Sequence, residues 1–405
     1  MSSTAGNSGD AQSTAAASLA EVIGAFERRY PPSYAESWDA VGLALGDPAQ
    51  PVRKVLFAVD PVDAVVDEAI EWGADLLVTH HPLFLRPVHS MAATTFKGRV
   101  AHRLTRAGIA LQVAHTNADA ATGGVADALA EAIGLVELEP LVPAPAEPLD
   151  KHVVFAPVDS ADAVIDAMAA AGAGAIGAYT RCAWTATGLG TFVPGPGAQP
   201  TVGQSGQAAQ VTEARVEMVA PRSARSAVLM AMRRAHPYEA PAFDVLELAS
   251  WPGGTGIGRV GRLAAPEKFA VFGQRVADAV PATVQGVRLA GDLDAQVQRI
   301  SVVGGSGDSL FDAVRASGAD AYVTADLRHH PASEARERAA HDGAGRPFLV
   351  DLAHFASEWP WLRRAAATLV ADLRAAGATV EVRVSVCVTD PWTARIPNPE
   401  QPRRD

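Results

Sequence analysis

The stretch Asp75–Phe84 constrains the fold of this chain more than any other, because it joins a short apolar run to two adjacent histidines. Leu76–Thr79 is apolar or β-branched, and Pro82 stops the run soon afterwards. Such a run is typical of a buried strand in a parallel sheet. His80 and His81 would then follow the carboxyl end of the strand, where open α/β sheets bind ligands. Two imidazoles there suit a divalent transition metal, although ordinary loop histidines remain the alternative.

The segment around this stretch has the alternating pattern of a βαβ protein. Strands are predicted over Lys54–Val59, Asp75–Thr79 and Ile109–Val113. Apolar residues at helical spacing predict helices over Val62–Trp72 and Arg99–Ala107 between them. Because parallel strands joined by helices place their carboxyl ends at one edge, residues that follow these strands are expected to be neighbours.

The C-terminal part of the chain repeats this order of elements. Gly73-Ala74-Asp75, followed by a strand, matches Gly318-Ala319-Asp320, which is also followed by a predicted strand. In both parts a further strand ends in a histidine, which is His115 in the first and His354 in the second. We therefore predict an α/β fold of two similar halves with mixed sheets.

The repeat places polar side chains where the predicted strands end. Asp119 follows His115, and Glu358 follows His354, with the same spacing of four, which puts each pair on one face of a helix. We expect one crevice to hold His80, His81, His115, Asp119, His354 and Glu358. Imidazoles and carboxylates in this combination suit two divalent ions with a bridging carboxylate. Taken alone, the pair of His115 and Asp119 is equally compatible with a metal site and with a capped loop in which the two residues are paired incidentally.

A segment of different pattern interrupts the two halves. From Lys151 to Leu248 the predicted order is β-α-β-β-α-β, which is the ferredoxin-like order. A proline-rich linker is predicted at Pro140–Asp150 and a loop at Pro252–Gly258. We predict an inserted ferredoxin-like domain over residues 150–250, within a metal-binding α/β domain formed by residues 18–140 and 255–392.

The ends of the chain and its composition exclude several classes of protein. Residues 1–17, rich in Ser, Ala and Gly, and residues 393–405 are predicted to be loose tails, and neither a signal peptide nor a membrane span is predicted. The two cysteines, Cys182 and Cys387, support neither a disulfide framework nor a thiolate zinc site, which favours a cytoplasmic protein. The net charge of −11 argues against nucleic acid as a partner.

Five further features are expected near the sheet edge or in the insert. Trp38 is predicted to be a core residue, and Asp39 to form a turn more readily than to bind a metal. The turn Ser306–Ser309 could hold a phosphate through its N–H groups, with a simple tight turn as the alternative. His330 could supply a proton or be merely buried. The motif at His236–Glu239 resembles a functional corner, but a strand entry that shapes the subunit contacts of the insert is the favoured interpretation.

Six motifs distributed over the two halves belong together. They are SWDAVGL at Ser37–Leu43, THHPLF at Thr79–Phe84, HTNAD at His115–Asp119, GGSGDSL at Gly304–Leu310, TADLRHH at Thr324–His330 and DLAHFASE at Asp351–Glu358. In these motifs the chain resembles the Nif-three-like dinuclear metal-centre proteins, whose members often carry the name of type-two GTP cyclohydrolase I homologues. The resemblance extends from Ser18 to about Trp392. Ala40 and Ala325 depart from the Asn and Gly that are frequent there, which leaves the choice of substrate open.

The resemblance implies a set of metal ligands and an assembly. Two divalent ions, of zinc, iron, manganese or cobalt, are expected on His80, His81, Asp119, His354 and Glu358. His115 and His330 would lie nearby as candidate catalytic residues. The family also implies a homo-hexamer, a trimer of dimers with its metal sites facing an internal cavity, and an insert that resembles the PII and CutA proteins.

Two functions of different class fit these expectations. Two ions a few ångströms apart activate water and hold an attacking and a leaving oxygen, which favours hydrolysis of a small-molecule substrate such as a nucleotide or phosphoester. The alternative is a non-enzymatic metal-binding scaffold or regulator that uses the insert as a sensor or docking module. Nothing in the residues selects guanine.

Overall fold

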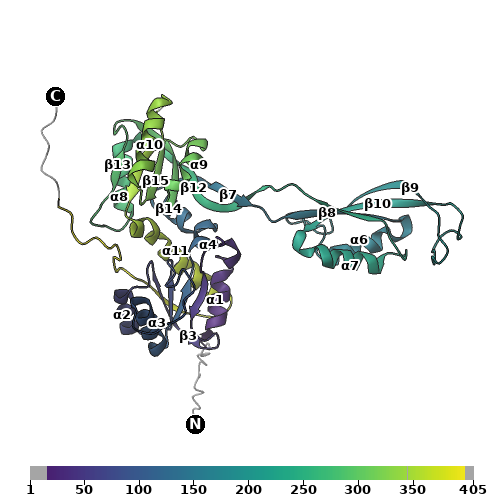
Figure 1. The fold of residues 1–405 in the computed structure, drawn as a ribbon, viewed down its shortest axis with the longest axis horizontal. Coiled ribbons are helices and arrows are strands. Elements are labelled where there is room, and N and C mark those ends of the chain that lie inside the picture. The colour runs from purple at the N-terminus through teal and green to yellow at the C-terminus, as the bar shows by residue number, and fades with distance from the viewer. Residues whose placement is uncertain (1–15, 344, 397–405) are drawn as a thin grey trace, which may run out of the picture. The chain divides into compact units, whose positions relative to one another are not determined.

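The computed structural model describes residues 16–343 and 345–396. The chain divides into two compact units (Figure 1). Unit 1 comprises the chain up to Ala144 and from Gly254 onward, whereas unit 2 comprises Pro145–Gly253. The two outer segments therefore fold together, and the segment between them folds by itself.

The first half of unit 1 is a sheet of five strands in the order β17-β4-β5-β6-β2. Its strands are parallel from β17 to β6, and β2 is antiparallel to β6. The N-terminal elements are β1 (Ala17–Ser18), α1 (Leu19–Glu27), η1 (Pro32–Tyr34), β2 (Gly42–Leu45), β3 (Pro51–Val52), β4 (Lys54–Ala58), α2 (Asp63–Trp72), β5 (Leu76–Thr79), α3 (Phe96–Ala107), β6 (Ala110–Val113), α4 (Thr116–Ala120), α5 (Val125–Ala132) and β7 (Val136–Pro145). This half confirms the predicted βαβ order.

The second half is a sheet of six strands in the order β13-β16-β15-β14-β12-β7. Here β14, β15 and β16 are parallel, and β13 and β12 run antiparallel to their neighbours β16 and β14. The C-terminal elements are β12 (Pro252–Lys268), α8 (Phe269–Ala279), β13 (Arg288–Ala290), β14 (Gln296–Ser306), η4 (Asp308–Leu310), α9 (Phe311–Ala316), β15 (Ala321–Ala325), α10 (His329–His341), β16 (Phe348–Leu352), α11 (His354–Ala375) and β17 (Glu381–Val384). Both sheets are mixed, as predicted.

The two halves share one hydrogen-bonding device at the start of a central strand. Before β5, the Asp75 carboxylate accepts the backbone N–H groups of Arg53 and Lys54 at 2.7 and 2.9 Å. Before β15, the Asp320 carboxylate accepts the N–H groups of residues 298 and 299 at 2.8 and 2.9 Å. Each aspartate thereby ties the start of its own strand to the preceding parallel strand, which supports the predicted repeat.

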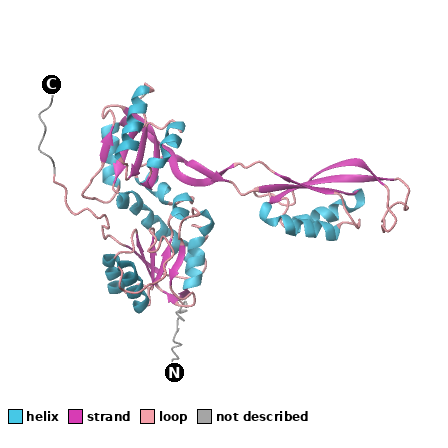
Figure 2. Ribbon diagram, viewed as in Figure 1, coloured by secondary structure: helices cyan, strands magenta, loops and turns pink. Residues whose placement is uncertain are grey.

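In unit 1, helices cover both faces of the five-stranded and the six-stranded sheet (Figure 2). On the five-stranded sheet, α2 and α3 pack on one face and α1 and α11 on the other. On the six-stranded sheet, α5 and α8 cover one face, and α9 and α10 the other. Strand residues therefore alternate between two cores, as Phe57 and Leu56 do in β4. Burial on both faces explains why these strands are continuously apolar.

Unit 2 is an antiparallel sheet with two helices on one face. The strand order is β11-β8-β10-β9, and all neighbours are antiparallel. Helices α6 and α7 share a core with alternate residues of β8 and β10, including Val154 and Val216. The bounds are β8 (Leu149–Pro157), η2 (Val158–Ser160), α6 (Ala161–Ala170), β9 (Trp184–Phe192), β10 (Ala209–Pro221), η3 (Arg222–Ala224), α7 (Arg225–Ala235) and β11 (Phe243–Glu247).

The predicted linker and loop at the ends of the insert are wrong. Residues 136–145 form β7 and residues 149–157 form β8, so strand structure replaces most of the linker predicted at Pro140–Asp150. The loop predicted at Pro252–Gly258 is the start of β12. Prolines are tolerated there because β7 is an edge strand and Pro252 is the first residue of β12.

The predicted N-terminal tail, residues 1–17, extends too far into the fold. Ala17 pairs with Val52 in a short antiparallel ladder and is only 4% exposed, so residue 17 belongs to the fold. Residues 1–15 and 397–405 of the two predicted tails lie outside the described residues.

Ser18 caps α1 through its hydroxyl, and Glu21 completes the capping box. Among the described residues, no helix combines the length and apolarity needed to cross a lipid bilayer.

The repeated aspartates are expected to contribute similarly to stability. Replacing Asp75 or Asp320 with Ala removes the acceptor of two backbone N–H groups, which should lower the free energy of unfolding by about 1–3 kcal/mol in each case. Urea unfolding followed by circular dichroism measures this change. The exposed Glu334→Ala change in α10 is the control, expected within about 0.5 kcal/mol of wild type. A large effect from only one of the two aspartates would contradict the equivalence.

Candidate metal centre

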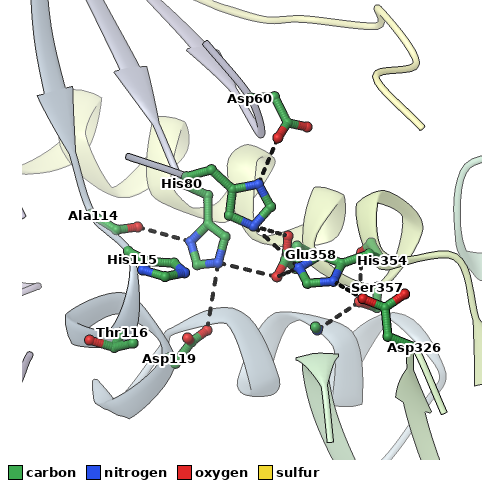
Figure 3. Close-up of polar contacts among 12 residues, drawn as sticks. Asp60, His80, Ala114, His115, Thr116, Asp119, Asp326, His354, Ser357 and Glu358 are labelled. Atoms are coloured by element: carbon green, nitrogen blue, oxygen red, sulfur yellow. Dashed lines mark hydrogen bonds and ion pairs between the residues drawn. The ribbon is translucent and has the colours of Figure 1, made fainter. Parts of the chain in front are cut away.

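Polar side chains from both halves meet at the carboxyl ends of the parallel strands. His80 and His81 directly follow β5, and His115 follows β6. His354 is the first residue of α11, which begins after β16, and Glu358 lies one turn further along that helix. In Figure 3 the side chains of His80, His354 and Glu358 point toward one another from separate elements. The predicted convergence of residues hundreds of positions apart is therefore present.

Glu358 lies at the centre of the cluster and is 3% exposed. Its Oε1 is 2.9 Å from His354 Nε2 and 3.4 Å from His80 Nε2, and its Oε2 is 3.1 Å from His81 Nε2. Each carboxylate oxygen thus faces the Nε2 atom of at least one imidazole. A buried carboxylate needs such partners, because burying an isolated charge is strongly unfavourable.

Asp119 and His115 extend the cluster on the side of the first half. Asp119 Oδ1 is 3.8 Å from His80 Nε2. Candidate ligand nitrogens of His80, His81 and His115 lie within 4.8 Å of one another, as do candidate ligand atoms of His81, His354 and Glu358. His81 therefore belongs to both groups, which makes the cluster continuous from one half of unit 1 to the other.

Each of the cluster's imidazoles is held by its Nδ1 atom. His80 Nδ1 donates to the Ala114 carbonyl at 2.9 Å, His81 Nδ1 to Asp60 at 2.7 Å, and His354 Nδ1 to Asp326 at 2.6 Å (Figure 3). Because these oxygens only accept, the proton is fixed on Nδ1 and the Nε2 atom is turned toward the cluster. Metal-binding histidines are oriented in this way by partners outside the ligand set.

His115 has the same arrangement with Asp39. Its Nδ1 donates to Asp39 Oδ1 at 2.8 Å, while Asp39 Oδ2 accepts the Thr116 N–H at 3.0 Å. Burial raises the pKa of Asp39, but the hydrogen bonds from His115 and Thr116 outweigh it and hold that pKa well below its usual range. Asp39, which is predicted from the sequence to form a turn, is thus also the ionised partner of the His115 imidazole. The N–H of Ala40, one of the two departures, donates to the same Asp39 at 2.7 Å.

The donor atoms fit a bound cation. Nε2 of His81 and Nε2 of His354 are 3.2 Å apart, and two nitrogen ligands of one tetrahedral zinc ion lie about 3.3 Å apart. Within the described part of the chain, His80 Nε2 and Glu358 Oε2 are buried without a hydrogen-bond partner. Buried polar atoms seldom lack a hydrogen-bond partner. These two atoms are therefore the strongest geometric sign that the cluster receives a ligand.

Without a metal, the cluster holds protons instead. Burial lowers the pKa of His81 and His354, but the charge of Glu358 and the partners at Nδ1 raise it to about 11 for His81 and about 10 for His354. Conversely, burial raises the pKa of Glu358, but the three imidazoles outweigh this effect and hold that pKa well below its usual range. Burial raises the pKa of Asp119. Positive charge is therefore required at this place, as protons or as metal.

A glycine turn of the second half approaches the cluster closely. Gly305 has φ +69°, and a Cβ atom there would lie 2.7 Å from Glu358 Oε1. The Gly305 N–H donates to the Ser357 hydroxyl at 2.8 Å, which holds the end of β14 against α11. Only glycine permits both this backbone conformation and the contact with Glu358.

A cavity of about 400 Å³ opens onto the cluster. Its walls combine the metal-site face (His115, Asp119, His354 and Glu358) with the turn residues Gly304–Ser306, Ser309 and Leu310. Trp38 also lines it and is 57% exposed, so the prediction of a core tryptophan is wrong. Trp38 stands edge-on to the His115 ring with the centroids 6.0 Å apart, so it forms part of the cavity wall.

The predicted site residues differ in where the structure places them. It brings together His80, His81, His115, Asp119, His354 and Glu358. His330 lies apart, as an exposed residue in the first turn of α10 that does not line the cavity. The turn predicted to bind phosphate contributes Ser306 and Ser309 to the cavity wall.

The carboxylates that orient the imidazoles were not singled out from the sequence. Asp60 follows β4, and Asp326 follows β15 in the left-handed region with φ 54°. Both stand directly after parallel strands, which is the same signal that marked the histidines. Asp326 shares its motif with Ala325, the second departure, which is fully buried as the last residue of β15.

Sequence comparison relates the chain to a described family. The family model for Duf34/NIF3 (NGG1p interacting factor 3) matches residues 17–391. A Mycobacterium tuberculosis protein named GTP cyclohydrolase 1 type 2 homolog is 50% identical over 375 residues, covering 92% of this chain and 96% of the relative. The Bacillus subtilis protein of the same name is 39% identical over 315 residues, covering 78% and 84%.

Solved structures give the same relation. A Bacillus cereus protein related to NIF3 is 37% identical, with a TM-score of 0.72, over 93% of this chain and 99% of that one. Staphylococcus aureus protein SA1388 is 27% identical, with a TM-score of 0.79, over 94% and 99%. The similarity therefore extends over nearly the whole chain in sequence and in structure.

Zinc binding by metal-free protein is expected to release protons. The raised pKa values keep His81 and His354 protonated near neutral pH, so a cation must displace about two protons from their Nε2 atoms. Calorimetric titration in buffers of different ionisation enthalpy measures the number released. The apparent affinity should rise with pH for the same reason. Binding heats that do not depend on the buffer would contradict the proton-holding cluster.

Proposed function

Because this chain belongs to the Duf34/NIF3 family, we propose that it is a dinuclear metal-binding protein and a metal-dependent hydrolase acting on a nucleotide or phosphoester. The observation that carries the proposal is the buried Glu358 carboxylate, whose two oxygens face three imidazole Nε2 atoms. Family membership supports the choice of site, and the donor set supports the choice of cation.

The proposed ligands are His80, His81, Asp119, His354 and Glu358. Glu358 suits a bridging role, because Oε1 faces His80 and His354 whereas Oε2 faces His81. Imidazole and carboxylate donors suit zinc, iron, manganese and cobalt alike, so the donor set supports divalent transition metals as a class. The rigid Nδ1 contacts favour a preformed site, since each ring is already turned toward the cluster.

Within this proposal, two bound divalent ions would supply an activated water and a clamp for the oxygens of a displacement. His115 would exchange a proton with the reacting groups through Nε2, because Asp39 holds its Nδ1 proton and the ring lines the cavity. His330, the other candidate from the sequence, lies outside the cavity lining, so His115 is the better candidate.

The cavity lining favours a substrate with few negative charges. Among the described residues that line it, none is Lys or Arg, whereas Glu36, Asp119 and Glu358 are acidic. The charge of a substrate phosphate would therefore be balanced by the bound cations. Trp38 offers an aromatic face to a planar group. GTP is a compound to test first, because the name of the relatives suggests it. No side chain that lines the cavity marks guanine specifically.

A non-enzymatic metal-binding scaffold or regulator is the second candidate. Unit 2 favours it, because a separately folded unit could serve as a sensor or docking module. The antiparallel strand order β11-β8-β10-β9, with its two helices, supports a ferredoxin-like insert of the PII or CutA kind. The homo-hexamer, a trimer of dimers, and the cytoplasmic location remain part of the proposal. Light scattering of purified protein tests the assembly.

Removing an orienting carboxylate should weaken metal binding without removing a ligand. Asp326→Asn keeps a residue that tolerates the left-handed backbone but loses the charged partner of His354 Nδ1, so metal affinity should fall about 10- to 100-fold. Competition with a fluorescent chelator measures the affinity, and elemental analysis the content. The exposed Asp312→Asn change is the control. Equal metal affinity in the two variants would contradict a role for the Asp326–His354 contact in metal binding.

Replacing His115 should separate catalysis from metal binding. With His115→Gln, turnover of a phosphodiester and nucleotide panel should fall about 100- to 10,000-fold while two ions remain bound. Asp39→Asn should lower turnover too, because it no longer fixes the Nδ1 proton. The exposed His341→Gln change is the control. If metal-loaded wild type turns over no compound, or His115→Gln is fully active, the scaffold alternative gains over this assignment.

A further inference from the structure

Unit 2 contains a cavity of about 360 Å³ that is separate from the candidate metal centre. It lies between strands β9 and β10, the loop after β9 and the motif at His236–Glu239. Its walls are largely apolar, with the rings of Phe155, Phe192 and Tyr238 among them. The centroids of Phe192 and Tyr238 are 6.2 Å apart, so two of these rings are already packed together.

A carboxylate without a counter-charge lies in this apolar setting. Glu213 of β10 lines the cavity, is half-buried, and makes no salt bridge within 4.0 Å to any described residue. The strand opposite is shaped to its side chain, since a Cβ atom at Gly190 would lie 2.0 Å from Glu213 Oε2. The nearby Arg215 guanidinium is engaged by Glu217 at 3.0 Å. The Glu213 charge therefore remains available to a ligand.

The phenol of Tyr238 is a second unused polar group. Its Oη is buried and has no hydrogen-bond partner in the described part of the chain. Burial, together with the neighbouring charge of Glu213, raises the pKa of Tyr238 to about 12, so the group stays a neutral hydroxyl. A buried hydroxyl beside an unpaired carboxylate is an arrangement that a ligand with N–H groups would satisfy.

The His236–Glu239 motif holds this wall in place. His236 Nε2 donates to the Phe155 carbonyl at 2.9 Å, and its Nδ1 accepts the Tyr238 N–H at 3.0 Å. The loop after β9 is fastened to the same motif, since Gln199 N–H donates to Glu239 at 3.1 Å and Thr201 to the Pro237 carbonyl at 2.9 Å. The motif predicted to enter a strand thus shapes a cavity.

We infer that unit 2 binds a small organic cation, an amine or amidine on an apolar or aromatic body, with its N–H groups on Glu213 and its body between the rings. No Lys or Arg is among the described residues of the lining, and both charged ones, Glu213 and Glu239, are acidic, which favours a cation over an anion. Aromatic faces also attract cations. The volume suits one small molecule. This inference does not rest on the proposed hydrolase.

Benzamidine and benzamide are matched probes for the inference, because they share an aromatic body and differ in charge. Full-chain protein should bind benzamidine at least about tenfold more tightly than benzamide, since a charge-assisted hydrogen bond to Glu213 is available to one probe only. Calorimetry or ligand-observed NMR gives both dissociation constants.

Variants locate the binding. Glu213→Gln should reduce the preference for benzamidine to within about twofold, and Tyr238→Phe should weaken benzamidine severalfold without changing the wall. Asp244→Asn, an exposed change in β11 outside the cavity, is the control and should bind as wild type does. Equal affinity for the two probes, failure of benzamidine to bind, or a preference retained in Glu213→Gln would each overturn the inference.

Discussion

The structure of unit 1 depends on one buried charge. Glu358 lies on a helix of the second half, yet two of its three imidazole partners, His80 and His81, come from the first. Because the carboxylate is buried, it cannot remain ionised unless positive charge is brought to it from both halves. The first half, the second half and the positive charge that they bring to Glu358 are therefore coupled. Trp361 packs edge-on below His80 at 5.5 Å, so the core and the site share one wall.

The strand directions of the two sheets explain how such distant residues meet. Parallel strands end at one edge, so each half presents its post-strand residues in the same direction. Asp75 and Asp320 each hold the preceding parallel strand through two of its backbone N–H groups. Polar residues that each half alone could place at a loop become a six-residue cluster when two such edges face each other. The insert leaves this arrangement untouched because it interrupts the chain between the halves.

Much of this could be predicted from the sequence, and the exceptions have physical causes. Short apolar runs, their bounding glycines and the histidines after them identified the strands and the cluster, because burial on both faces leaves a strong pattern. Strand structure around Pro143 and Pro252 was missed, since proline usually opposes strands and its tolerance depends on edge position, which is known only from the pairing. Asp60 and Asp326 were missed because their role depends on ring orientation. Trp38 was assigned to the core because a large ring at a cavity wall leaves no pattern of its own.

Strands β7 and β12, which lead into and out of the insert, are hydrogen-bonded neighbours in one sheet. Gly256 of β12 approaches Val142 and Ala144 of β7 so closely that a Cβ atom would collide with their backbone. The two cut points of the insertion are thus already side by side, as the arms of a hairpin are. A segment added or removed at this point would leave the surrounding sheet intact, because the two ends that it joins are already adjacent.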